Sequence, residues 1–368
     1  FRLDENGEPA ERNDVSLAGL IHKMGYRGTT STVLSFGEKD DCHGYLVGEE
    51  HQGLKYMFLM MNEARLGVGF GAAMVGYAGY RYSLAYAKER TQGRVAPHNK
   101  PTDKAATIIQ HGDVKRMLLA QKSYVEGGMA LCFYAARLVD ELHTLESPEA
   151  KQRTAELLDL LTPVVKAWPS EFGPKANDLA IQILGGSGYT REYPVEQCWR
   201  DNRLNPIHEG TNGIQALDLM TRKLWQANGS GLVQLQKMMS EDFAKAQHQA
   251  SKRLIADLQP YLAKLQKLIP VIGAELKGEN QNSLLANASC FLTIFGQIVV
   301  SWMWIRQAIT AEAALNGGSL SSDDEAFYRG KLQAAKYFID WELTVTDRDF
   351  KILNSMNDSC SNMQEAWF

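Results

Sequence analysis

Apolar residues recur at helical spacing over most of this chain, and only its first part alternates in the way a strand does. Between residue 1 and about residue 48, β-branched or alternating runs cover 15–21 and 30–36, and glycine-rich turns interrupt them. From about Glu49 the apolar period lengthens, and no proline occurs before Glu89. We therefore expect a few strands followed by long helices.

The same pattern predicts helices as far as the C-terminus. They cover approximately 49–89, 105–142, 148–167, 174–184, 211–225, 232–268, 283–315 and 323–354. In the first of them, Gly67 and Gly71 lie four residues apart on one face, and Gly76 and Gly79 follow. Because a glycine costs about 1 kcal/mol relative to alanine inside a helix, we expect this helix to pack closely against another one.

One stretch, 284–305, carries no charged residue and is long enough to cross a bilayer. Polar residues recur within it, however, including Asn287, Thr293 and Gln297. Such groups would need partners in lipid. We therefore expect a buried helix of the bundle and no membrane span.

Composition narrows the class of protein. The 368 residues are 45% hydrophobic and 22% charged, which suits a large core and about two or three domains. A net charge of -4 without a dense basic run does not favour nucleic acid as a partner. The five cysteines are widely separated, so we expect reduced thiols and a cytoplasmic location. The chain begins at Phe1 in a polar segment, which we interpret as a truncated or proteolysed chain.

The strongest candidate for chemistry is the carboxylate of Glu209 in the stretch 205–215, Asn-Pro-Ile-His-Glu-Gly-Thr-Asn-Gly-Ile-Gln. Pro206 ends one segment, and Thr211 or Asn212 can N-cap the next helix. Glu209 would thus project from a turn near a helix N-terminus, as a base aimed into a pocket. The alternative is an ordinary solvated acid of a loop.

Several ordered motifs surround this stretch. Upstream lie Gln-Ile-Leu-Gly-Gly-x-Gly-Tyr at 182–189, Glu-Tyr-Pro-Val-Glu at 192–196 and Arg-Asp at 200–201. Together with Ile-His-Glu-Gly-Thr they resemble the C-terminal helical domain of the acyl-CoA dehydrogenases. The segments 24–54 and 86–94 are similar to the end of that family's middle β-domain and to its helix-to-helix turn. The resemblance covers about 13–223.

The resemblance implies a fold and a domain order. We expect a mainly α protein with a remnant of the β-domain at 1–48, the catalytic helical bundle at 49–226 and a second helical extension at 227–368. The long extension and the sequence around Glu209 resemble most the branch of larger acyl-CoA dehydrogenases that contains 3-methylmercaptopropionyl-CoA dehydrogenase.

The resemblance also implies an activity and a base. FAD-dependent α,β-dehydrogenation of an acyl-CoA would give the trans-2-enoyl-CoA, with Glu209 abstracting the α-proton and FAD taking the β-hydride. Gly210, Asn62 and Arg65 match positions near the substrate, although Asn62 replaces the usual aspartate. We interpret His208 as packing beside the thioester rather than as a proton relay.

Other positions match contacts to FAD in the family, partly to the FAD of a neighbouring subunit. They are Arg90, Gln92, Gln182, Gly185, Gly186 and Thr211. The resemblance therefore implies a homo-oligomer, a dimer or a tetramer, with electron-transfer flavoprotein as the electron acceptor. The turn after Arg90 is one residue shorter than in relatives, which weakens the match of Gln92 most. For Arg90 the alternative is a charge that stabilises a helix C-terminus.

No pattern indicates a metal site. None of the eight histidines lies three residues after a glutamate, and Asn212 stands where a His-Glu-x-x-His motif would have its second histidine. Two other functions stay open, namely an acyl-CoA oxidase that uses oxygen and a noncatalytic helical scaffold. Because the family's N-terminal half has no counterpart in this sequence, we expect this chain alone to be inactive.

Overall fold

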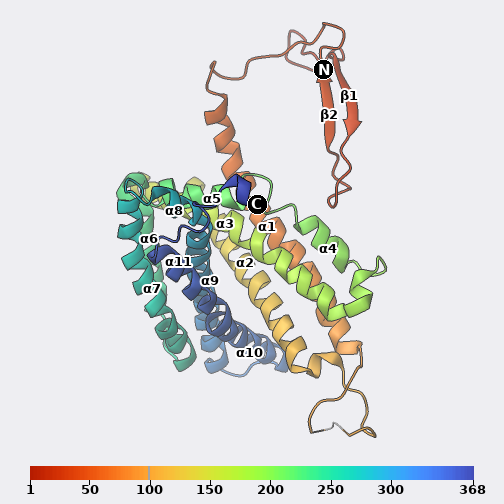
Figure 1. Ribbon diagram of the computed structural model, residues 1–368, viewed down its shortest axis with the longest axis vertical. Helices are drawn as coiled ribbons and strands as arrows, with labels where there is room; N and C mark the ends of the chain where they lie inside the picture. Colours follow the sequence, from red (N-terminus) through yellow and green to blue (C-terminus); the bar gives the residue numbers. More distant parts are fainter. Residues whose placement is uncertain (98–99) are drawn as a thin grey trace. The chain divides into compact units, whose positions relative to one another are not determined.

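The computed structural model describes residues 1–97 and 100–368, which form two compact units. The first unit, 1–63, contains a two-stranded antiparallel sheet of β1 (Val15–Leu20) and β2 (Thr32–Phe36), drawn in red in Figure 1. Val15 pairs with Phe36, and an irregularity follows Leu17. Both strands lie within the predicted runs.

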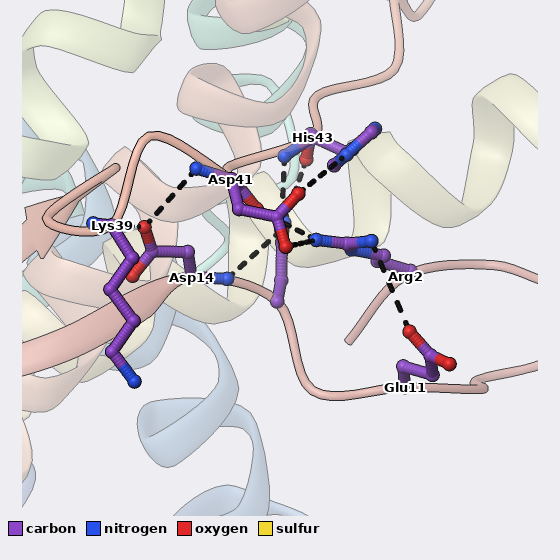
Figure 2. A network of polar contacts seen from close by, with 7 residues as sticks. Arg2, Glu11, Asp14, Lys39, Asp41 and His43 are labelled. Atoms are coloured by element: carbon purple, nitrogen blue, oxygen red, sulfur yellow. Dashed lines mark hydrogen bonds and ion pairs between the residues drawn. The ribbon is translucent and has the colours of Figure 1, made fainter.

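A polar network fastens the loops around this sheet (Figure 2). Arg2 forms an ion pair with Asp41, whose carboxylate also lies 3.2 Å from Nε2 of His43. The hydrogen bond from Arg2, and then that from His43, lower the pKa of Asp41. Asp14 accepts from the backbone N–H of Lys39 at 2.6 Å. All these contacts are solvent-exposed, so the network orders loops and adds little stability.

The second unit, 64–368, is helical, and the long α1 (Gly53–Glu89) leads into it. The mainly α fold is confirmed. The further α-helices among the described residues are α2 (Gly112–Thr144), α3 (Pro148–Leu184), α4 (Val195–Asn202), α5 (Asn212–Asp218), α6 (Ser230–Phe243), α7 (Gln249–Glu275), α8 (Gln281–Ala286), α9 (Ala288–Asn316), α10 (Ser322–Tyr337) and α11 (Thr346–Asn354).

The prediction of two helices over 148–184 was wrong, because α3 is continuous. Pro163, Pro169 and Pro174 all lie inside it. A proline removes one helical hydrogen bond and normally breaks a helix. Here every residue from 161 to 170 is buried, so packing on several sides outweighs the lost bonds.

Close packing of α1 is seen at Gly76 and Gly79, as the sequence predicted, but not at Gly67 or Gly71. A Cβ at Gly67 or Gly71 would meet nothing within 4 Å. A Cβ at Gly69 would instead overlap the Val165 carbonyl oxygen, and one at Gly76 would lie 3.1 Å from the Cα of Gly173 in α3. Gly69, Gly76 and Gly79 therefore form the face of α1 that packs closely against α3.

The uncharged stretch forms most of α9, which α7, α10 and α11 flank in Figure 1. Length and composition alone would let α9 span a membrane, yet 83% of its most apolar window is buried among other helices. Its core continues from Leu131 in α2 to Leu353 in α11. Helices on both sides of residue 226 thus share one core, and the predicted division at 226 stays a prediction.

Three predicted helices of the C-terminal region are each interrupted. Residues 232–268 form α6 and α7, 283–315 form α8 and α9, and 323–354 form α10 and α11 with a π-helical turn and a 3-10 turn between them. At the first break, Glu312 of α9 accepts hydrogen bonds from the N–H groups of Ala250 and Ser251, both at 2.8 Å, and so caps α7. A cap from a distant helix leaves no local pattern.

Candidate functional site

Glu209 lies in the loop between α4 and α5, in a left-handed turn. Its φ is 54°, and that of Gly210 is 81°. Thr211 N-caps α5 by accepting from the N–H of Gly213 at 3.3 Å, as the sequence suggested. Glu209 is half-buried. A left-handed conformation costs a non-glycine residue about 1 kcal/mol, so the surroundings must hold this turn.

A chain of buried amides holds the loop on one side. Asn202 at the end of α4 donates to the Ala72 carbonyl of α1 at 3.0 Å and to Asn177 of α3 at 2.7 Å. Asn205 donates to Asn202 at 2.8 Å, and His208 Nε2 donates to Asn205 Oδ1 at 3.2 Å. The residues before Glu209 are thereby fixed to two long helices.

A glutamine holds the turn from the other side. Gln215 of α5 is fully buried, and its Nε2 donates to the carbonyls of Glu209 at 3.4 Å and Gly210 at 3.2 Å. A Cβ at Gly210 would approach this Nε2 to 2.7 Å. Only glycine therefore fits this turn without moving Gln215.

Two cations lie beside the turn. Arg65 of α1 is 5% exposed, and its Nη1 lies 3.9 Å from Asp218. Its Nη2 would lie 3.7 Å from a Cβ at Gly210. Lys166 of α3 is fully buried and donates to the carbonyl oxygen of Asn205 at 2.9 Å. Arg65 was singled out from the sequence, whereas Lys166 was missed although it interrupts an apolar run.

The charges affect one another. Burial, and then the Arg65 charge, lower the pKa of Lys166 to about 8, and Glu209 partly offsets this. Burial, and then the Lys166 charge, lower the pKa of His208. His208 therefore tends to be neutral at neutral pH, while Lys166 is mostly charged. Two cations beside this turn suit the binding of a substrate in which negative charge develops.

A second region brings together five predicted cofactor residues. A cleft of about 680 Å³ forms where the end of α1 meets the end of α3, and its lining includes Arg90, Gln92, Gln182, Gly185 and Gly186. A Cβ at Gly185 or Gly186 would meet nothing within 4 Å, so the backbone there is open to a ligand. Thr211, the sixth predicted cofactor residue, does not line this cleft and lies two residues after Glu209.

The turn that follows Arg90 is held by backbone bonds. Ile108 N–H donates to the Arg90 carbonyl at 2.8 Å, and Gln92 N–H donates to the Ala106 carbonyl at 2.9 Å. His111 Nε2 donates to the Gln92 carbonyl at 2.8 Å. His111 also lines the cleft. Sequence reasoning missed it, because a histidine before a helix carries no signal of its own.

Asn62 belongs to the first unit, and its contact with the substrate stays a prediction. Among the residues that the structure describes, no three His, Cys, Asp or Glu side chains gather where they could hold a metal ion.

Comparison with known proteins identifies the family. Residues 51–224 match the acyl-CoA dehydrogenase C-terminal domain, and residues 232–364 match the domain described as acetyl-CoA dehydrogenase C-terminal like. The chain therefore belongs to the acyl-CoA dehydrogenase family and carries its C-terminal domains.

Two curated relatives are each 33% identical to this chain. The broad-specificity linear acyl-CoA dehydrogenase FadE5 of Mycobacterium tuberculosis matches 99% of this chain and 61% of its own length. The 3-methylmercaptopropionyl-CoA dehydrogenase of Ruegeria pomeroyi matches 96% and 59%. The chain thus spans about three fifths of the length of these relatives.

Solved structures share the fold. Caenorhabditis elegans ACDH-11 in complex with C11-CoA superposes with a TM-score of 0.70 at 21% identity, over 89% of this chain and 51% of that one. An acyl-CoA dehydrogenase of Bacillus anthracis complexed with FAD superposes with a TM-score of 0.63 at 19% identity, over 94% and 60%.

Proposed function

We propose that the protein is an FAD-dependent acyl-CoA dehydrogenase with Glu209 as its base. The observation that carries this proposal is the turn at Glu209, which has a left-handed backbone and lies beside the cations of Arg65 and Lys166. The two relatives that match almost all of this chain are named as dehydrogenases of acyl-CoA.

The chemistry assigns one step to this chain. The carboxylate of Glu209 takes a proton from the α-carbon of the thioester, and the two electrons of that C–H bond form the α,β double bond. FAD, when bound, supplies the acceptor for the hydride that leaves the β-carbon. The backbone N–H of Glu209 donates to the thioester carbonyl as it gains enolate charge. The product is the trans-2-enoyl-CoA.

The cleft of Arg90 suits the diphosphate part of FAD. Arg90 offers a guanidinium for phosphate oxygens, and the open backbone at Gly185 and Gly186 allows close approach. We propose that this cleft receives the FAD of a neighbouring copy, so that the protein works as a homo-oligomer. Electrons would leave through electron-transfer flavoprotein.

Substitution of the base tests the proposal. In the protein of natural length loaded with FAD, Glu209→Gln should slow flavin reduction by an acyl-CoA about 10²- to 10⁴-fold, because a general base contributes that much to the rate. The FAD content should stay unchanged. Anaerobic stopped-flow absorbance with butanoyl-, octanoyl- and hexadecanoyl-CoA measures the rate.

Reduction by Glu209→Gln within about tenfold of the wild type would refute the assignment of the base. Glu241→Gln is the matched control, because Glu241 is an exposed glutamate of α6. Rapid reoxidation of the reduced wild-type flavin by air would indicate an oxidase. A preparation of natural length that binds no flavin would favour a scaffold.

A further inference from the structure

Lys166 is the one lysine of α3 that is buried completely, and its neighbours in the sequence are buried with it. An ammonium group is costly to bury unless hydrogen bonds satisfy it. Its Nζ donates to the Asn205 carbonyl oxygen at 2.9 Å and to Asn212 Oδ1 at 3.1 Å. Both acceptors belong to the segment that carries Glu209.

These two acceptors stand at the two ends of the loop. Asn205 precedes Glu209, and Asn212 follows it as the first residue of α5. The N–H of Asn212 also donates to the Pro206 carbonyl at 3.0 Å, which draws the ends together. Asn212 Nδ2 donates back to the Ala167 carbonyl of α3 at 3.4 Å. One side chain of α3 therefore ties the loop at both ends.

The conformation of the loop needs such a tie. The left-handed φ of 54° at Glu209 is unfavourable for a residue with a side chain, and it persists only where surrounding contacts impose it. Gln215 binds the two carbonyls of the turn itself. Lys166 fixes the ends of the loop, and Gln215 fixes its middle.

We propose that Lys166 is a positioning residue, which holds the Glu209 carboxylate at the α-carbon of the substrate by binding both ends of its loop from α3. The role in the reaction rests on the proposed function, whereas the role in holding the loop does not. A displacement of about 1 Å at a reacting group can cost about 10²-fold in rate.

The charge of Lys166 makes the tie depend on pH. The charged and titratable groups that act on it are Arg65 from α1 and Glu209 and His208 from the loop. Because burial lowers the pKa of Lys166 to about 8, the ammonium is present below that pH and is lost as the pH rises through it. A neutral amine is a weaker donor to both acceptors.

The first test is Lys166→Met in the protein of natural length loaded with FAD. Methionine keeps the length of the side chain but removes the charge and the donors. We expect flavin reduction by octanoyl-CoA to slow about 10²-fold with KM changed less than about threefold. Lys166→Arg should restore part of the rate. In the wild type, the rate should fall above about pH 8, and in Lys166→Arg this fall should move to higher pH because a guanidinium stays charged.

The second test needs no catalysis. Hydrogen exchange of the amides at 207–211 should be at least about tenfold faster in Lys166→Met, with exchange in α9 unchanged. Lys331→Met is the matched control, because Lys331 is a half-buried lysine of α10 that binds Glu126 at 2.7 Å and does not bind the loop. If Lys166→Met does not fold, Asn212→Ala removes one of the two bonds and should show the same changes to a smaller extent.

The outcomes separate the two proposals. A wild-type protein whose flavin no acyl-CoA reduces would refute the proposed function, and the exchange data would still decide whether Lys166 holds the loop. Unchanged exchange in Lys166→Met would refute the positioning role. Faster exchange with a reduction rate within about twofold of wild type would also refute it, because the position of the loop would then not limit the reaction.

Discussion

The two parts of the candidate site are built in different ways. The loop of Glu209 is held by buried side chains, namely Asn202, Gln215 and Lys166, each less than 1% exposed. The turn after Arg90 is held mainly by backbone bonds, together with one hydrogen bond from the side chain of His111. A part that the core holds cannot change without affecting the fold, whereas the residues of an open cleft can change with little effect on it.

The largest effect that would test this contrast is expected at Asn202. Asn202→Ala removes donors to Ala72 and Asn177 and the acceptor of Asn205, all buried. Unsatisfied buried polar groups cost about 1–3 kcal/mol each, so the free energy of unfolding should fall by about 3 kcal/mol. Denaturant unfolding followed by circular dichroism measures it. Asn362→Ala, which removes an exposed amide, should change it by less than about 0.5 kcal/mol.

If Asn202→Ala lowers the free energy of unfolding by less than about 1 kcal/mol, the claim that buried side chains hold the Glu209 loop is contradicted. It would mean that the amide chain is not what holds the loop.

A smaller effect is expected at Arg90. Because Arg90 is exposed, Arg90→Ala should leave the free energy of unfolding of the apoprotein within about 0.5 kcal/mol of wild type. Its affinity for FAD should fall about tenfold, through loss of a charge-assisted contact to phosphate. Fluorescence titration with FAD gives the dissociation constant. An unchanged constant would mean that Arg90 only stabilises the C-terminus of α1.

The smallest effect is expected in a comparison of alanine substitutions at two adjacent glycines, Gly185 and Gly186. Gly185 has a φ of 59°, whereas the φ of Gly186 is outside the left-handed region, and a Cβ at either position meets nothing within 4 Å. Gly185→Ala should therefore lower the free energy of unfolding by about 1 kcal/mol, and Gly186→Ala should leave it unchanged. Equal losses in thermal unfolding would contradict this explanation.

The sequence predicted the class of fold well and the boundaries of its helices less well. Periodicity identified the strands and the helical character of the other α-helices, but it missed the short α4, Val195–Asn202. It failed between residues 167 and 174, at Pro169 and Pro174, where burial keeps α3 intact. It also failed between α6 and α7, where the cap comes from Glu312 on another helix.

The same limit applies to the site. Glu209, Gly210 and Arg65 could be singled out, because motifs of fixed spacing surround them. Lys166 and the amide chain could not, since each residue is ordinary in its own helix and acquires its role only when α1, α3 and α4 meet. The five cofactor residues came from a resemblance, and their grouping in one cleft could not have been derived from spacing alone.

The most direct test of the central claim is anaerobic mixing of the FAD-loaded protein of natural length with octanoyl-CoA, in parallel with octanoyl-CoA deuterated at the α-carbon. Our account predicts that the flavin band bleaches, that the trans-2-enoyl-CoA forms in the amount of the flavin, and that the α-deuterated substrate reacts several-fold more slowly. A flavin that stays oxidised with every acyl-CoA chain length would contradict it.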